Sequence, residues 1–194
     1  MKPLIFATHN KNKVSEVASI LHGQFDVKSL FEIGFKEDIP EPFYTIKENA
    51  IQKARVVHEK TGLDCFSEDT GLEVEALNGE PGVRSARYAG EEHDFEANIE
   101  KLLGKMKNIK NRRARFVTII CLLWNGKQYL FEGECKGSVL QARKGSMGFG
   151  YDSIFIPEGS SKSFAEMEME EKNKFSHRRK ATEKLIRFLQ EPVS

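Results

Sequence analysis

The sequence lacks the features that mark several common classes of protein. Its 194 residues include three cysteines, Cys65, Cys121 and Cys135, which form no CxxC pair and no zinc-ligand spacing with histidine. An odd number of thiols, two of them in apolar runs, is typical of buried free cysteines in a reducing cytosol. No apolar stretch approaches the roughly 20 residues of a membrane span, and the first apolar run is too short for a signal peptide. We therefore expect a cytoplasmic globular protein with no membrane partner.

An excess of charge of one sign is also missing. Lys and Arg number 30 and Asp and Glu number 29, so the formal net charge is +1. This balance creates no general field that would attract nucleic acid, and any anion site must be built locally. The length suits one domain that can bury roughly 70% of its unfolded surface. Without repeats or low-complexity linkers, residues 1–194 are expected to form a single domain with no nucleic-acid partner.

Hydrophobic patterns along the chain alternate between strands and helices. A strand at 3–7, a helix at 11–21 and a strand at 25–29 predict a first βαβ-like unit. LDCFSEDTG indicates a short strand that runs into a turn. Further predicted elements are a helix ending at Gly62, a strand before Asn78-Gly79, a helix in HDFEANIEKLLGKM, a hairpin turning at Asn125-Gly126, a short strand at 153–156 and a last helix at 174–189. The predicted fold class is α/β with a mixed sheet.

Polar residues follow the first strand in FATHNKNK. Thr8 and Asn10 come directly after this buried strand, and Lys13 lies in the first turn of the helix. Open α/β sheets bind ligands at the carboxyl ends of their strands, and a helix N-terminus offers free N–H groups to phosphate. The stretch lacks P-loop glycines, so side chains would share the phosphate contacts. The alternative is a simple helix cap.

Acidic residues suggest a metal site. Glu68 and Asp69 adjoin in SEDTG, and Glu41 lies in the proline-stiffened DIPEP. A turn could direct both adjacent carboxylates into one cleft, although in an extended strand they would point to opposite faces. Carboxylates from separate loops suit Mg²⁺, which keeps several waters and binds substrate phosphates. The alternative is a capping carboxylate with solvated loop acids.

Two further stretches have the chemistry of base recognition. In KGSMGFGYDSIF, glycines flank Phe149 and leave its ring free to stack on a base, although the ring could equally belong to the core. The last helix has Ser176 as a possible N-cap, yet it begins with His177, Arg178 and further basic residues. Cations are unfavourable at a helix N-terminus. Either this turn is solvated surface or something electron-rich lies against it.

Together these stretches resemble the inosine/xanthosine triphosphate pyrophosphatase family. The shared motifs are FATHNKNKVSEV, DIPEP, ENAIQKAR, SEDTGLEVEALNGEPGVRSARYAG, GFGYDSIF and FAEM…EKNKFSHRRKA, in order over nearly the whole chain. The resemblance implies an elongated mixed β-sheet with flanking helices, two lobes around a central nucleotide-binding cleft, and a homodimer. It also implies Mg²⁺-dependent hydrolysis of noncanonical purine nucleoside triphosphates (ITP, dITP and XTP) to the monophosphate and pyrophosphate.

The resemblance assigns roles to individual residues. Asp69 would accept the proton of the attacking water, with Glu68 beside it and with Lys13 and Lys53 stabilising phosphate charge. Glu41 and Asp69 would bind the metal. The substrate would contact Thr8, His9, Asn10, Lys11, Asn12, Lys13, Thr70, Phe149, Gly150, Tyr151, Asp152, Lys172, Ser176, His177 and Arg178. Two of these depart from the family pattern, since many relatives have glycine at His9 and tryptophan at Tyr151.

The chemistry leaves two questions open. A carboxylate that binds Mg²⁺ loses basicity, so either Asp69 shares both roles or Glu68 takes one of them; we favour Asp69 as the base. His177 and Arg178 would donate to the 6-oxo group of hypoxanthine or xanthine. Adenine has an amino donor there, and an unpaired buried polar group costs about 1–3 kcal/mol. This argument excludes ATP but not GTP.

Other functions remain possible from the sequence. The protein could be a related pyrophosphatase that acts on a pyrimidine triphosphate. It could also be an RNA-binding module that uses KMKNIKNRRAR, Lys105–Arg115, although a basic run without aromatics is more typical of a solvated loop. A third possibility is an interaction scaffold that pairs through the hairpin and catalyses nothing.

Overall fold

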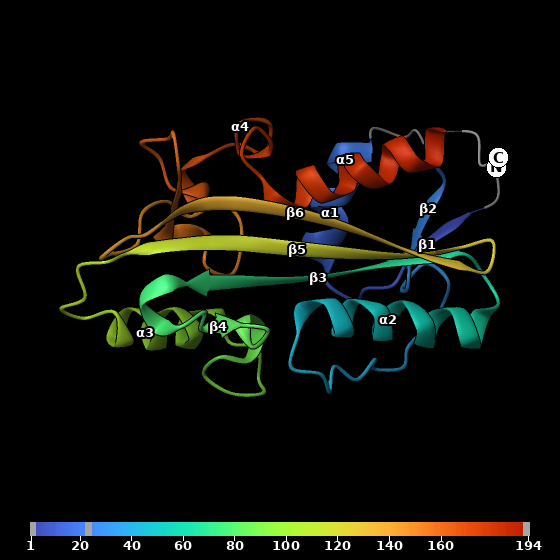
Figure 1. Ribbon diagram of the computed structural model, residues 1–194, viewed down its shortest axis with the longest axis horizontal. Helices are drawn as coiled ribbons and strands as arrows, with labels where there is room; N and C mark the ends of the chain where they lie inside the picture. The colour runs from blue at the N-terminus through green and yellow to red at the C-terminus, as the bar shows by residue number, and fades with distance from the viewer. Residues whose placement is uncertain (1–2, 22–24, 192–194) are drawn as a thin grey trace. The chain divides into compact units, whose positions relative to one another are not determined.

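The computed structural model describes residues 3–21 and 25–191, which form an open mixed sheet of seven strands flanked by helices (Figure 1). The strand order is β2-β1-β3-β5-β6-β7, and β4 pairs with β3 off this path. This confirms the predicted α/β class. The strands are β1 (Leu4–Phe6), β2 (Val27–Ser29), β3 (Cys65–Val74), β4 (Pro81–Gly82), β5 (Arg113–Trp124), β6 (Lys127–Val139) and β7 (Phe155–Pro157). The α-helices are α1 (Lys11–Leu21), α2 (Ile46–Thr61), α3 (Phe95–Lys105), α4 (Met169–Asn173) and α5 (His177–Gln190).

The described residues group into two compact units. The first unit lies within Met1–Asp69, Thr118–Gly133 and Arg178–Ser194. The second unit lies within Thr70–Val117 and Glu134–His177. Whether residues 1–194 behave as a single domain stays a prediction.

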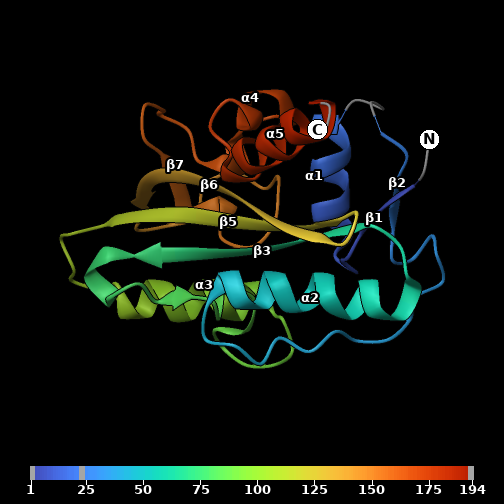
Figure 2. The same ribbon diagram turned by 45° about the vertical axis from the view of Figure 1, so that its right-hand side comes forward.

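The first unit contains the predicted βαβ arrangement. β1 pairs in parallel with β2, with Leu4 opposite Val27, and also in parallel with β3. Helices α1 and α5 cover one face of these strands, and α2 covers the other (Figures 1 and 2). The core of this unit is apolar and includes Leu4, Phe6, Val17, Ile20, Leu21, Phe66, Ile120, Leu122, Ala181, Leu185 and Ile186.

Local signals determine the ends of α2. Thr45 Oγ1 accepts the Glu48 N–H at 3.1 Å, which caps the N-terminus. At the other end Gly62 adopts a left-handed φ of 66°, and its N–H donates to the His58 carbonyl. These are the start and stop that the sequence predicts.

The second unit packs around a separate apolar core. Its α3 begins after Asp94, whose carboxylate accepts the N–H groups of Glu96 and Ala97. β4 pairs antiparallel with β3, with Gly82 opposite Leu72. The buried members of this core are Leu72, Val74, Tyr88, Ile99, Leu102, Met106, Ala114, Phe116, Cys135, Val139, Tyr151, Ile154, Phe155, Phe164 and Met167.

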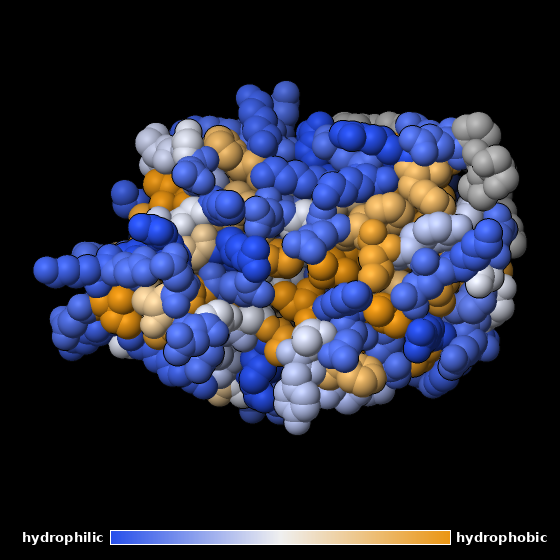
Figure 3. Space-filling view, in the orientation of Figure 1, coloured by the Kyte–Doolittle hydropathy of each residue, from blue (hydrophilic) through white to orange (hydrophobic). Residues whose placement is uncertain are grey.

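The predicted hairpin is confirmed. β5 and β6 are neighbours in the sheet, and Asn125 and Gly126 connect them with φ values of 48° and 75°. Positive φ at both central residues is the geometry that Asn-Gly favours in a tight hairpin turn. Hydrophilic side chains cover most of the face shown in Figure 3. Among the residues that the structure describes, no helix is both long and apolar enough to cross a membrane.

The prediction of a turn at SEDTG is wrong. β3 continues without interruption from Cys65 to Val74, so Glu68 and Asp69 lie in its middle. Leu72 and Val74 are fully buried, and pairing with β4 keeps the chain extended past Gly71. Tertiary pairing therefore overrides the turn preference of Thr-Gly.

Two smaller differences occur near the C-terminus. The strand expected at 153–156 is a 3-10 turn, Asp152–Ile154, followed by β7. The segment between β7 and α5 contains the short helix α4, which the sequence patterns do not predict.

Candidate active site

The loop after β1 places Asn10 at the start of α1. Asn10 Oδ1 accepts the backbone N–H groups of Asn12 at 3.0 Å and Lys13 at 3.2 Å, so Asn10 caps the helix. Thr8 Oγ1 accepts the Asn10 N–H at 3.1 Å. The helix cap, which the sequence allowed as the alternative to a phosphate site, is therefore present. It also fixes the first turn of α1, whose N–H groups suit an anion.

Three neighbouring residues, one in this loop and two at the start of α1, are exposed. His9 is exposed, and its Nε2 lies 3.0 Å from the Glu37 carbonyl oxygen. Lys11 and Asn12 are also exposed. Contact between these side chains and a substrate stays a prediction.

Lys13 extends from α1 to β3. Its Nζ donates to the Glu68 carbonyl oxygen at 3.3 Å and lies 3.4 Å from Glu68 Oε1. Burial lowers the pKa of Lys13, and the positive charges of Lys53 and Arg178 lower it further against the opposing effect of Glu68 and Asp69. Lys13 is therefore a partly buried amine whose charge is disfavoured by burial and by neighbouring cations and favoured by two carboxylates.

Arg178, in the first turn of α5, is buried between two carboxylates. Its Nε donates to Glu68 Oε2 at 2.6 Å and its Nη2 to Glu68 Oε1 at 2.9 Å. Its Nη1 also donates to Glu16 Oε2 on α1. Burial opposes the charge on Arg178, but the two carboxylates outweigh burial and raise its pKa. The electron-rich group against this basic turn is thus supplied by the chain itself.

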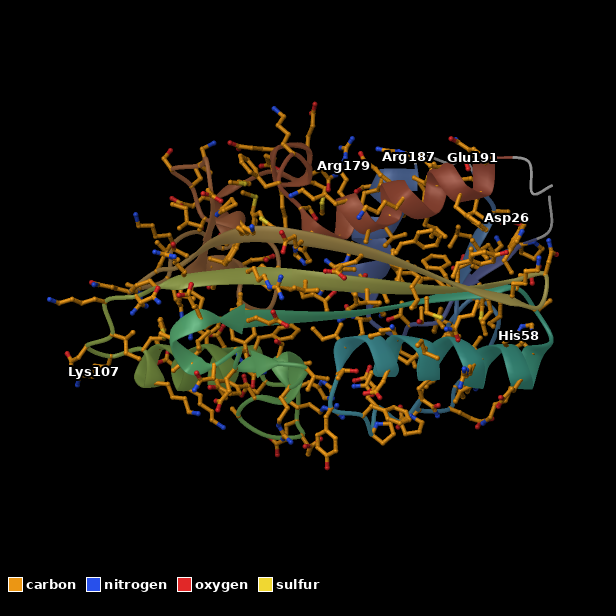
Figure 4. All side chains as sticks on the ribbon, viewed as in Figure 1. Asp26, His58, Lys107, Arg179, Arg187 and Glu191 are labelled. Atoms are coloured by element: carbon orange, nitrogen blue, oxygen red, sulfur yellow. The ribbon has the colours of Figure 1, made fainter. Side chains whose placement is uncertain are left out.

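The neighbouring arginines of α5 behave differently. Arg179 is partly exposed and pairs with Glu183 one turn later at 2.6 Å. Arg179 and Arg187 lie on the outer side of α5 (Figure 4). The basic helix start is therefore part buried ion pair and part solvated surface, so both readings of the sequence hold for different residues.

Lys53, on α2, joins the two predicted metal ligands. Its Nζ lies 2.5 Å from Glu41 Oε1 and 2.9 Å from Asp69 Oδ1. Burial works against the Lys53 charge, yet Asp69 and Glu41 raise its pKa overall. Burial raises the pKa of Asp69, although Lys53 and Lys13 act in the opposite direction. The cluster is thus two carboxylates around one ammonium, with one carboxylate less acidic than an ordinary aspartate.

Adjacent residues of β3 serve opposite faces of the sheet. Glu68 reaches Lys13 and Arg178, on α1 and α5, whereas Asp69 reaches Lys53, on α2. This follows from the alternation of side chains along an extended strand. A turn that directs both acids into one cleft, which the sequence allowed, is therefore absent from β3.

In the second unit, Asp152 organises the glycine-rich loop. Its Oδ2 accepts the Phe149 N–H at 2.9 Å and the Lys172 Nζ at 2.7 Å. The Lys172 ammonium also lies 5.5 Å from the centre of the Phe149 ring, which is partly exposed. Gly148 has a φ of +77°, and a Cβ there would meet Asp152 Oδ2 at 2.1 Å. Glycine is required at this position so that the loop can close on Asp152.

Other predicted contacts of the second unit are buried. The Tyr151 hydroxyl donates to the Ser85 carbonyl oxygen at 2.9 Å, and burial raises its pKa. The His177 ring stacks on Phe116 with 4.6 Å between ring centres. Ser176 is buried as well, directly before α5. Tyr151 therefore works as part of the core, while Phe149 presents the accessible ring.

Family and structure comparisons place these features in a known context. A model of the Ham1 family matches residues 4–188. The chain belongs to the Ham1 family. A dITP/XTP pyrophosphatase of Flavobacterium psychrophilum is 52% identical over 185 residues, which cover 95% of this chain and 97% of the relative. The dITP/XTP pyrophosphatase of Bacillus subtilis is 45% identical over 194 residues, covering 98% of each chain.

Solved Ham1 structures share the fold. The Ham1 protein of Staphylococcus aureus matches with a TM-score of 0.88 and 38% identity, over 97% of this chain and 98% of that chain. A nucleoside-triphosphatase, or dITP/XTP pyrophosphatase, of Mycobacterium abscessus matches with a TM-score of 0.76 and 36% identity, over 97% and 100%. The family resemblance seen in the motifs is thereby confirmed.

The donor set of this Ham1 chain is compatible with a divalent cation. No group of three or more His, Cys, Asp or Glu side chains that could hold a metal occurs among residues 3–21 and 25–191. Glu41 and Asp69, however, direct one oxygen each at the same ammonium. Mg²⁺ takes one or two carboxylates and completes its shell with substrate phosphates and waters. The residues present therefore fit Mg²⁺.

Several side chains of the basic run Lys105–Arg115 are engaged within the second unit. Lys105 pairs with Glu80 at 2.5 Å, and Arg115 contacts two glutamates. Arg112 donates to the carbonyl oxygens of Met106, Val139 and Leu140. Side chains that serve the protein's own structure are poor phosphate ligands for RNA, so this alternative loses support.

Sequence reasoning missed Glu16. It lies on the α1 face that buries Val17, Ile20 and Leu21, and only 4% of it is exposed. An acidic residue on a buried helix face is the available signal, since such a charge must be paired. Its partner, Arg178, is 162 positions away and could not be identified from spacing.

Proposed function

We propose that this Ham1 chain hydrolyses noncanonical purine nucleoside triphosphates, ITP, dITP and XTP, to the monophosphate and pyrophosphate in an Mg²⁺-dependent reaction. The observation that carries the proposal is the buried cluster in which Lys53 joins Asp69 and Glu41, with Lys13 on Glu68 at the next position of β3. Lysine side chains next to Asp69, a carboxylate whose pKa is raised by burial, suit the hydrolysis of a polyphosphate. The dITP/XTP pyrophosphatase name of the relatives supports this substrate class.

The first unit would bind the triphosphate. Lys13 and Lys53 are the charge-stabilising groups for its phosphate oxygens, the largest expected contribution in phosphoryl transfer. The backbone N–H groups at the start of α1, held by the Asn10 cap, are a second source of donors. Thr8 and the exposed Lys11, Asn12 and His9 would complete the contacts.

Glu41 and Asp69 would hold the metal. Mg²⁺, when bound, neutralises charge on phosphate oxygens. Lys53, which contacts both carboxylates, would lie beside the metal and supply an ammonium to the phosphates.

Asp69 is the better candidate for the general base. Both Glu68 oxygens accept hydrogen bonds from Arg178, so that carboxylate is already occupied. Burial raises the pKa of Asp69 and makes it more basic. Asp69 would take one proton from a water whose oxygen bonds to the α-phosphorus. The bond from that phosphorus to the bridging oxygen breaks, and pyrophosphate leaves with the bonding electrons.

The second unit, with the start of α5, would recognise the base. The ring of Phe149 would stack on the purine, while Gly150, Asp152, Tyr151 and Thr70 shape its surroundings. Lys172, Ser176 and His177 would present donors to a 6-oxo group, whereas the guanidinium of Arg178 is occupied by Glu68 and Glu16. Adenine places a donor at that position and is rejected for lack of an acceptor.

We further propose that the protein is a cytoplasmic homodimer. Phe31 is 83% exposed and Tyr44 is 93% exposed, both in the segment that connects β2 with α2. Large aromatic residues are enriched in protein interfaces. Size-exclusion chromatography with light scattering tests this part, and a monomer at micromolar concentration contradicts it.

The decisive experiment measures pyrophosphate release from ITP, XTP, GTP and ATP, with Mg²⁺ and with a chelator. We expect release from ITP and XTP, far slower release from GTP and ATP, and no release with the chelator. The Asp69→Asn variant should lose roughly 10²–10⁴-fold in rate, while Glu59→Gln, which changes an exposed acid on α2, should match the wild type. Turnover of a pyrimidine triphosphate would support the roles proposed for the phosphate-binding residues and contradict those proposed for the base-binding residues. No turnover of any triphosphate would contradict the whole proposal.

A further inference from the structure

Glu16 is a buried carboxylate to which the family resemblance assigns no role, although it lies in the motif FATHNKNKVSEV. Its side chain is 5% exposed, on a helix face that otherwise packs Val17, Ile20 and Leu21 into the core. Moving a carboxylate out of water is costly unless an opposite charge and hydrogen bonds compensate. Here Arg178 supplies both, since its Nη1 donates to Glu16 Oε2.

Arg178 links Glu16 to Glu68 rigidly. The Nε and Nη2 edge of the guanidinium meets both oxygens of Glu68 at 2.6 and 2.9 Å, and the Nη1 side meets Glu16. A planar guanidinium held on two sides cannot rotate without breaking a buried ion pair. The side chains of Arg178 and Glu68 are 3% and 0% exposed, so water cannot replace a lost partner.

Lys13 depends on the same carboxylate. Its Nζ contacts the carbonyl oxygen and Oε1 of Glu68. Two cations, Arg178 and Lys13, thus share Glu68, and Glu16 brings the four groups to charge balance. Without Glu16, Arg178 and Lys13 would compete for one carboxylate at the place where a phosphate must bind.

We propose that Glu16 is a positioning residue for the triphosphate site, because it holds Arg178 and thereby fixes Glu68 and the Lys13 ammonium. This inference rests on the proposed function, in which Lys13 binds phosphate. Glu16 itself touches Arg178 and acts on the substrate only through it. Helices α1 and α5, which carry Glu16 and Arg178, lie on the same face of the first unit (Figures 1 and 2).

The test compares Glu16→Gln with a matched control, Glu183→Gln, which breaks the exposed pair with Arg179 on α5. In Glu16→Gln, kcat/KM for ITP should fall about 10- to 100-fold, mostly in kcat, while the thermal transition remains cooperative. Glu183→Gln should keep wild-type kinetics. A Glu16→Gln enzyme with wild-type kcat/KM overturns the proposal, as does a loss of activity that merely tracks partial unfolding.

A second readout does not need catalysis. The rate at which an amine-reactive reagent labels Lys13, followed by mass spectrometry, reports the position and charge of its ammonium. We expect Glu16→Gln to change this rate severalfold and to leave exposed Lys47 unchanged. If the wild type hydrolyses no triphosphate but Lys13 labelling still responds to Glu16, the proposed function fails and the positioning survives. Unchanged Lys13 labelling overturns the positioning.

Should Glu16→Gln fail to fold, Glu16→Asp gives the answer. Aspartate keeps the negative charge but is one methylene shorter, so it satisfies charge balance without reaching Arg178 in the same way. We expect a partial loss of kcat and a partial change in Lys13 labelling. Wild-type values for both would show that charge alone is needed and would overturn a positioning role.

Discussion

The Lys53 ammonium lies 2.9 Å from Asp69 Oδ1, on the side of β3 that faces α2. This contact joins the residue that would stabilise phosphate charge to the residue that would take a proton from water. Burial raises the pKa of Asp69, and the Lys53 charge lowers it. Asp69 in turn raises the pKa of Lys53.

Replacing Asp69 should affect both the rate and its dependence on pH. Loss of a general base typically costs 10²–10⁴-fold, and we expect Asp69→Asn to fall in that range. The pKa of Asp69 is raised, so the wild-type enzyme should lose kcat/KM on acidification at a pH above the ordinary aspartate value of about 3.9. A pH–rate profile of pyrophosphate release checks this. An acid limb that persists unchanged in the residual activity of Asp69→Asn would assign it to another group.

Removing Lys53 should reduce both activity and stability. Lys53→Met leaves Glu41 and Asp69 facing each other without a cation, which is expected to cost roughly 3 kcal/mol of unfolding free energy and about 10²–10³-fold in kcat. The pKa of Lys53 is raised by folding, so its stabilising contribution is complete below the ordinary lysine value of about 10.4 and is lost only in more alkaline solution. Urea unfolding at about pH 7 and about pH 9 should therefore show the same deficit.

The matched control for this variant is Lys47→Met, which changes an exposed lysine of the same helix. It should unfold like the wild type and keep its activity. If both variants lose stability equally, the effect belongs to α2 in general and the buried cluster contributes little.

A methyl group at Gly148 should disturb base recognition. Its Cβ would meet Asp152 Oδ2 at 2.1 Å, and φ is +77°, so Gly148→Ala is expected to cost about 1–3 kcal/mol. The shift of Asp152 should also release Lys172 and raise KM for ITP more than it lowers kcat. Gly104→Ala is the control, since a Cβ there meets nothing within 4 Å in helix α3. Thermal unfolding and steady-state kinetics of the two variants decide the matter.

Tyr151 should contribute to stability without selecting the base. Tyr151→Phe removes the hydrogen bond to the Ser85 carbonyl oxygen and is expected to cost about 1 kcal/mol. The ratio of ITP to GTP turnover should stay at the wild-type value, because this hydroxyl is directed into the core. A change in that ratio, measured with equal protein concentrations, would place Tyr151 against the purine instead.

The three thiols should be unreactive in the native protein. Cys65, Cys121 and Cys135 are free and buried, and burial raises the pKa of Cys65 and of Cys121 to about 12. Because the thiolate is the reactive form, a disulfide reagent at about pH 8 should modify none of them before unfolding and all of them in guanidinium. Fast modification of any one in the native state contradicts this burial.

The elements that were predictable from the sequence are those with local causes. Thr45 and Gly62 delimit α2 through contacts within one turn, and Asn125-Gly126 determines the hairpin by its own backbone preference. The continuity of β3 was not predictable in this way. It depends on the pairing of Leu72 with Gly82 and on burial in the second unit.

The same division applies to the candidate site. The sequence identifies Lys13, Asp69 and Phe149 as candidate site residues, because each belongs to a motif with an identifiable chemistry. The pairing of Arg178 with Glu68 spans 110 positions, and no short-range pattern encodes it. Which residues bind a ligand and which bind each other is thus decided by tertiary structure.

The uninterrupted course of β3 limits how this strand can evolve. Glu68 and Asp69 face different helices because side chains alternate along the strand. An insertion of one residue between Cys65 and Glu68 would exchange the surroundings of the two acids, whereas an insertion of two would restore them. Insertions in this part of β3 are therefore tolerable only two residues at a time. Insertions in the loops on either side are not restricted in this way.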